Sequence, residues 1–74
     1  MKLSITAPAQ RDIDRAAAFY ALERPGLGAE FIEEVARVLA VLRSNPWLGQ
    51  RLDDTYRRAL MRTFPYSLMY RLDN

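Results

Sequence analysis

The side chains with the greatest chemical potential lie in the last third of the chain, where arginines and tyrosines alternate with apolar residues. Arg57, Arg58 and Arg62 occur close together, and Tyr66 and Tyr70 follow them. Guanidinium groups bind phosphate oxygens or carboxylates bidentately, and tyrosine rings stack on bases. These five residues are therefore candidates for contact with a charged protein or a nucleic acid.

The residue types that are missing narrow the chemistry further. The 74-residue chain has neither histidine nor cysteine. This excludes an imidazole general base, Ser-His-Asp and Cys-His catalysis, disulfides, and metal sites made of thiolates or imidazoles. Cleavage of RNA would need an acid and a base held together, and the arginines and tyrosines offer no convincing pair. We assign no catalytic residue and expect no metal and no cofactor.

The same side chains also have purely structural interpretations. Alternate arginines are typical of the solvated face of a strand, with Asp53 and Asp54 close enough in sequence to neutralise them. Core packing is favoured for Tyr66 and Tyr70, because both fall on a strand face with leucines. Trp47 is either an interface residue or a plug for the end of a helical hairpin, and the plug is favoured.

Two helices are predicted to precede this region. Apolar residues recur at helical spacing over residues 9–23 and again over 29–44, and residues 24–28 contain one proline and two glycines. The pattern predicts a helical hairpin with a continuous apolar face. Such a face can form a groove for a partner helix, although each residue on it would also serve as core. The groove candidates are Ile13, Ala17, Val38, Leu42 and Trp47.

Three segments have the pattern of strands. Residues 2–6 alternate apolar and polar side chains, and the aromatic-rich segments 56–63 and 66–72 flank a turn near Pro65. The order strand, helix, helix, strand, strand predicts one small α+β domain in which the helical hairpin packs on a three-stranded antiparallel sheet. We expect this sheet to have bare edges that a partner completes.

Charge and hydropathy restrict the partners. The chain has 11 basic and 9 acidic residues, a net charge of +2, and ten of the basic residues are arginine. Arginine favours bidentate contacts with carboxylates or phosphates, but this net charge is far below a strongly basic nucleic-acid footprint, so direct nucleic-acid binding stays open. No apolar run has the length of a signal peptide or a membrane span. We therefore expect a soluble, cytoplasmic protein without membrane association.

Several segments form a recognisable set. Residues 23–31 have the sequence ERPGLGAEF, residues 45–46 are Asn-Pro, residues 57–60 are RRAL, and residues 64–70 are FPYSLMY. In composition and in spacing these segments resemble the ParE/RelE superfamily of type II toxin–antitoxin toxins, and they are nearer to the ParE, plasmid-stabilisation type than to the RelE type. The resemblance covers nearly the whole chain and implies the α+β fold predicted above.

The resemblance also implies a function. It implies a cytoplasmic toxin that is neutralised by a cognate antitoxin, which is acidic and partly disordered until bound and which we expect in the helical groove. ParE-type members are associated with inhibition of DNA gyrase. Two alternatives stay open, namely a RelE-like mRNA endonuclease and an inactive, truncated toxin-fold interaction module. Family members usually continue into a further strand or two, so the resemblance implies a single toxin domain over residues 1–74 that lacks them.

Overall fold

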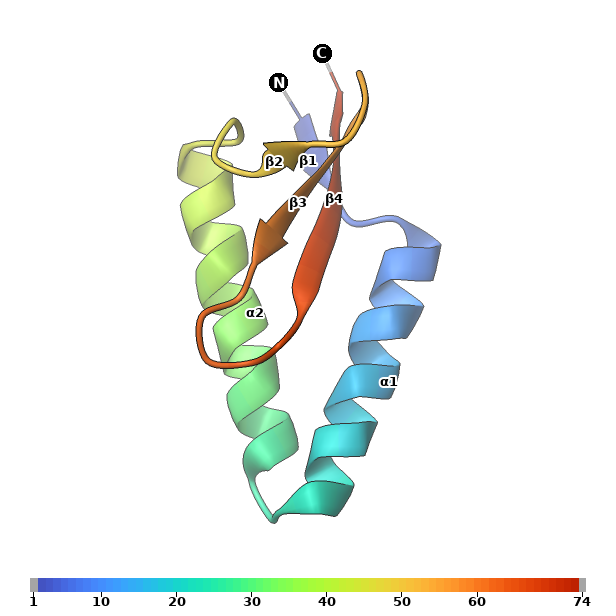
Figure 1. The fold of residues 1–74 in the computed structure, drawn as a ribbon, viewed down its shortest axis with the longest axis vertical. Coiled ribbons are helices and arrows are strands. Elements are labelled where there is room, and N and C mark those ends of the chain that lie inside the picture. The colour runs from blue at the N-terminus through green and yellow to red at the C-terminus, as the bar shows by residue number, and fades with distance from the viewer. Residues whose placement is uncertain (1, 74) are drawn as a thin grey trace.

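The computed structural model describes residues 2–73 (Figure 1). Its elements are, in chain order, β1 (Lys2–Ser4), α1 (Ala7–Glu23), α2 (Leu27–Ser44), β2 (Gln50–Arg51), β3 (Tyr56–Leu60) and β4 (Ser67–Asp73). This confirms the predicted α+β class and the helical hairpin. Met1 and Asn74, the ends of the predicted 1–74 domain, lie outside the described residues. No helix within residues 2–73 is long and apolar enough to cross a membrane.

The first helix begins two residues earlier than predicted because its amino end is capped. Thr6 is the N-cap residue, and its hydroxyl accepts a hydrogen bond from the Ala9 N–H at 3.3 Å. Pro8 lies in the first turn, where its missing N–H leaves no intrahelical bond unmade. The α1 helix therefore starts at Ala7 rather than at residue 9.

The second helix also begins two residues early, and glycine is the reason. Gly26 adopts a φ of 85°, a left-handed conformation that glycine takes at little cost, and the chain reverses there so that Leu27 and Gly28 already belong to α2. A Cβ at Gly28 would lie 2.7 Å from the carbonyl oxygen of Ala17. The absence of a side chain at this position thus lets the two helices approach closely beside their connecting turn.

Within residues 2–73 the sheet has four strands in the order β1-β4-β3-β2, all antiparallel. The prediction of three strands was wrong because β2, only two residues long, pairs with β3 through Gln50 and Arg51. The strand predicted over 56–63 ends at Leu60, where the Met61 N–H donates to the Tyr66 carbonyl at 3.0 Å and closes the hairpin loop. The last strand runs one residue beyond the predicted 66–72.

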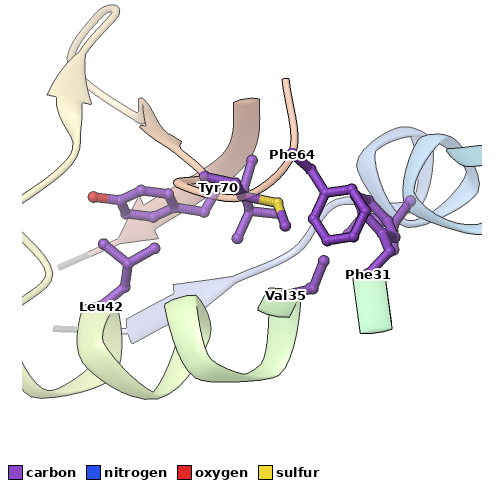
Figure 2. Packing of buried hydrophobic residues seen from close by; sticks show 8 residues of the cluster. Phe31, Val35, Leu42, Phe64 and Tyr70 are labelled. Carbon is purple, nitrogen blue, oxygen red and sulfur yellow. The ribbon is translucent and has the colours of Figure 1, made fainter. Parts of the chain in front are cut away.

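The core lies between the sheet and the helical hairpin. Leu68, Tyr70 and Leu72 alternate along β4 and are buried, whereas the residues between them are exposed on the face without helices. Figure 2 shows the Tyr70 ring above Leu42 and the Phe64 ring beside Phe31, whose centroids are 5.2 Å apart. The chain therefore covers the apolar face of its own hairpin, which leaves the opposite face of the sheet open (Figure 1).

Candidate functional site

A groove of about 580 Å³ lies between α2 and the part of the sheet formed by β2 and β3. We call it the α2–β3 groove. Its volume is in the range of ordinary ligand-binding sites. The apolar residues that line it come from one side of α2, from the loop before β2 and from the end of β3. They are Val38, Val41, Leu42, Leu48, Ala59 and Leu60.

The charged residues of the groove are mostly arginines. Arg37, Arg58 and Arg62 line it together with Glu34, which leaves a surplus of two positive charges. Glu34 is 7% exposed, and its Oε1 accepts from Nη2 and Nε of Arg37 at 2.6 and 3.1 Å. A buried carboxylate requires such a partner. Because the one acidic side chain is already paired, the groove is electrostatically suited to an acidic partner.

Within residues 2–73, the backbone of β3 has no neighbouring strand where it borders this groove. Strand β2 covers β3 only as far as Arg58, which pairs with Gln50. The Leu52 N–H donates to the Tyr56 carbonyl at 2.9 Å, so alternation along the strand places the N–H and C=O groups of Tyr56, Arg58 and Leu60 on the same side. Among residues 2–73, no strand lies beside Leu60 on that side, and its side chain is 76% exposed.

The predicted contact residue Arg57 has a structural role in this fold. It pairs with Tyr70 across the sheet and therefore points toward the helix side. Its Nη1 donates to the carbonyls of Trp47 and Gly49 at 3.2 and 2.8 Å, and its guanidinium carbon lies 5.0 Å from the centre of the Trp47 ring. The side chain thus fastens the loop that follows α2 to the sheet.

The other two predicted arginines lie elsewhere. Arg58 follows Arg57 in the strand, so it projects to the opposite, helix-free face, where its Nε donates to Oε1 of Gln50 at 3.0 Å. Arg62 is exposed in the loop between β3 and β4. Arg58 and Arg62 both line the α2–β3 groove, but Arg57 does not. The structure therefore divides a cluster that is continuous in sequence.

The predicted tyrosines are anchored by hydrogen bonds. Tyr70 is 0% exposed, and its hydroxyl donates to the Pro46 carbonyl at 2.7 Å and accepts from the Gly49 N–H at 3.1 Å. Tyr66 is half-buried and donates to Oδ2 of Asp12 at 2.8 Å. Burial, followed by the Asp12 carboxylate, raises the pKa of Tyr66 far above its ordinary value. Neither hydroxyl is therefore placed to act as a general base. The Tyr70 ring is also not accessible to a nucleobase or to a partner protein.

The predicted groove on the helical hairpin is not present among the described residues. Ile13 and Leu42 are each 2% exposed and belong to the core, and Ala17 lies against Gly28. Trp47 was favoured as a plug for the hairpin end, but it is 57% exposed and contacts Arg57 instead. The sheet therefore covers much of the apolar face on which the partner-helix prediction relied.

Two members of that predicted set, Val38 and Leu42, line the α2–β3 groove, and Val38 is half-buried. Sequence analysis missed Arg37, Val41, Leu48 and Leu60. A signal existed for three of these four. Arg37 and Val41 continue a second stripe beside the core stripe of α2, and Leu60 is an apolar residue on the polar face of β3.

Comparison with known proteins identifies a matching family. The family model described as ParE toxin of the type II toxin–antitoxin system, parDE, matches residues 3–74. No curated protein gives a significant match to the chain. No solved structure gives one either.

Proposed function

We propose that this chain, which belongs to the ParE toxin family, acts as the toxin of a type II toxin–antitoxin pair and is neutralised by an antitoxin bound along the α2–β3 groove. The observation that carries this proposal is an apolar groove with a surplus of positive charge beside an unpaired strand edge. The expected antitoxin is acidic and partly disordered until it binds. A segment of this kind acquires order by burying apolar side chains against such a surface.

The energetics favour the groove over the helical hairpin as the binding surface. Val41, Leu48 and Leu60 are all exposed around the groove, whereas the core face of the hairpin is already covered. Complete burial of an aliphatic side chain is worth about 1.5–3 kcal/mol relative to full exposure. Since these three side chains are still more than half exposed, a partner that covers them gains on the order of 1 kcal/mol from each.

DNA gyrase is the cellular target that we propose, because the sequence resembles the ParE type more closely than the RelE type. Cleavage of mRNA receives no support from the predicted residues. The hydroxyls of Tyr66 and Tyr70 are engaged in hydrogen bonds, and Arg57 is bound to loop carbonyls. An inactive interaction module would bind the antitoxin equally well, so a growth measurement is needed to distinguish the two.

The experiment is inducible expression in a bacterial host, alone and together with the acidic open reading frame beside the gene. We expect growth arrest that co-expression relieves, and co-purification of the two proteins. Purified protein should inhibit gyrase supercoiling while ribosome-bound mRNA stays intact. Normal growth with retained co-purification would identify an inactive module, and a monomer indifferent to the neighbouring protein would refute the proposal.

A further inference from the structure

We infer that the α2–β3 groove is occupied by an extended segment that adds a strand at Leu60, and that this segment consists of three apolar residues between acidic ones. The inference rests on the proposed function and specifies how the antitoxin is recognised. It combines three observations: the unpaired edge of β3, the apolar lining of the groove, and the arginines around it.

The backbone geometry requires an extended segment. Both the N–H and the C=O of Leu60 lie on the groove side of β3, and a residue opposite it in an antiparallel strand exchanges two hydrogen bonds with them. A partner helix uses its own N–H and C=O groups internally, so it would leave those of Leu60 unpaired under the partner. Strand addition is the binding mode that pairs the N–H and C=O of Leu60 while burying them.

The alternation of side chains determines the apolar part of the pattern. Cross-strand partners lie on the same face of a sheet, so the residue opposite Leu60 sits beside its exposed side chain on the helix-free face. The residues before and after it point to the other face, toward α2, where Val38 and Val41 line the groove. All three positions therefore favour apolar side chains.

The arginines determine the two ends of the pattern. Arg58 lies two positions before Leu60 in the chain and Arg62 two positions after it, and both line the groove. The new strand would run in line with β2 and must end where Gln50 already pairs with Arg58. Carboxylates at both ends of a short apolar segment would then lie within reach of guanidinium groups, with Arg37 on the α2 side.

A second copy of this chain does not fit the same edge. Antiparallel self-pairing centred on Leu60 would place Arg58 opposite Arg62 of the second copy, and like charges directly opposite each other destabilise a strand pair. The charges of this edge thus act against self-association and in favour of an acidic strand.

The test uses a fluorescein-labelled peptide, Gly-Ser-Asp-Val-Leu-Val-Glu-Ser-Gly, and the full chain, with binding followed by fluorescence anisotropy. N-methylation of the central leucine removes the N–H that would bond to Leu60, and we expect the dissociation constant to rise about tenfold or more. N-methylation of the valine after it is the matched control, because that N–H points away from β3, and we expect little change. Replacement of both acidic residues by lysine should weaken binding at least as much as the leucine methylation.

Variants of the protein test the same contact from the other side. Of the backbone hydrogen-bonding groups, Leu60→Pro removes only the N–H of residue 60, which faces the groove, and proline is tolerated on a strand edge. We expect it to weaken peptide binding about tenfold, while Leu60→Ala, which keeps the N–H, weakens it less than about threefold. If circular dichroism shows that the Leu60→Pro variant is unfolded, the peptide series measured with the unaltered chain still decides the question.

Four results would overturn the inference. The first is absence of binding by the parent peptide, and the second is equal affinity of the two N-methylated peptides. The third is a bound peptide that is helical rather than extended. The fourth is dimerisation of the chain in place of peptide binding. The proposed function fails separately, if the antitoxin neither co-purifies with the chain nor restores growth. An antitoxin that does both, and that binds the Leu60→Pro variant as well as the parent chain, refutes only the inference of strand addition.

Discussion

Tyr70 and Gly49 are joined by a hydrogen bond of 3.1 Å from the Gly49 N–H to the tyrosine hydroxyl, although they are 21 positions apart in the chain. The same hydroxyl donates to the Pro46 carbonyl. Because Tyr70 points toward the helices, these bonds hold the loop before β2 on the helix side of the sheet. Strand β2 therefore begins only at Gln50, and the edge of β3 is left free at Leu60.

Replacement of Tyr70 by phenylalanine should test this connection. The ring would still fill the core, but a buried N–H and a carbonyl would lose their partner, and we expect a loss of about 1–3 kcal/mol in the free energy of unfolding. Urea denaturation measures it. Tyr66→Phe is the control, because its hydroxyl bonds to the exposed Asp12 and its removal should cost less. Equal losses in the two variants would show that the Tyr70 hydroxyl has no special role.

Substitution of Gly49 by alanine should be more damaging than a glycine substitution elsewhere. A Cβ at this position would collide with the Tyr70 hydroxyl and approach the Arg58 carbonyl oxygen within 2.9 Å. Since Tyr70 is fully buried, it has little room to move, and we expect about 1–3 kcal/mol of destabilisation from overpacking. Gly26→Ala is the comparison: its φ of 85° is strained for alanine, but no atom lies within 4 Å, so about 1 kcal/mol is expected.

A comparison between Gly49→Ala and Gly26→Ala by thermal unfolding decides the point. A larger loss of stability in Gly26→Ala than in Gly49→Ala would mean that the left-handed backbone at Gly26 restricts the residue type more than the contact of Gly49 with Tyr70 does. Gly49→Ala should in addition alter the end of β2, which hydrogen exchange at Gln50 and Arg51 would detect as faster exchange.

A charge placed in the groove should abolish antitoxin binding without unfolding the toxin. Val41 and Ile32 are both exposed aliphatic residues of α2, but only Val41 lines the α2–β3 groove. We expect Val41→Glu to reduce co-purification of the antitoxin at least tenfold, because it adds a negative charge opposite an acidic segment and removes apolar contact. Ile32→Glu should leave co-purification unchanged. The same effect in both variants would place the antitoxin outside the groove.

Acid unfolding should depend on Asp53, which fixes the turn between β2 and β3. Its Oδ1 accepts from the N–H groups of Tyr56 and Thr55, each at 2.8 Å, and these bonds lower the pKa of Asp53 below its ordinary value. A lowered folded-state pKa stabilises the fold above the unfolded-state pKa, and this contribution disappears as the pH falls through the folded value. The stability of Asp53→Asn should thus vary less with pH below about pH 4. Denaturant titrations from pH 6 to pH 2 measure this, and parallel curves for the two proteins would contradict it.

Local patterns in the sequence were sufficient for much of the fold. Helical spacing predicted both helices, and the errors at their starts came from Thr6 and Gly26, whose capping and left-handed conformations let each helix begin two residues earlier. Strand β2 escaped prediction because two residues have no periodicity. Its existence depends on β3, which follows it in the chain, and on the loop that Tyr70 holds.

The sequence by itself determined the family, the fold class and the presence of surplus arginine, since these follow from residue types and from spacing within single segments. Only the tertiary structure decided which surface is free. Ile13 was a candidate partner contact, but the fold buries it in the core, and neighbouring Arg57 and Arg58 face opposite sides of a strand. The physical reason is that exposure of a side chain depends on which distant segments fold against it, and no periodicity within one segment contains that information.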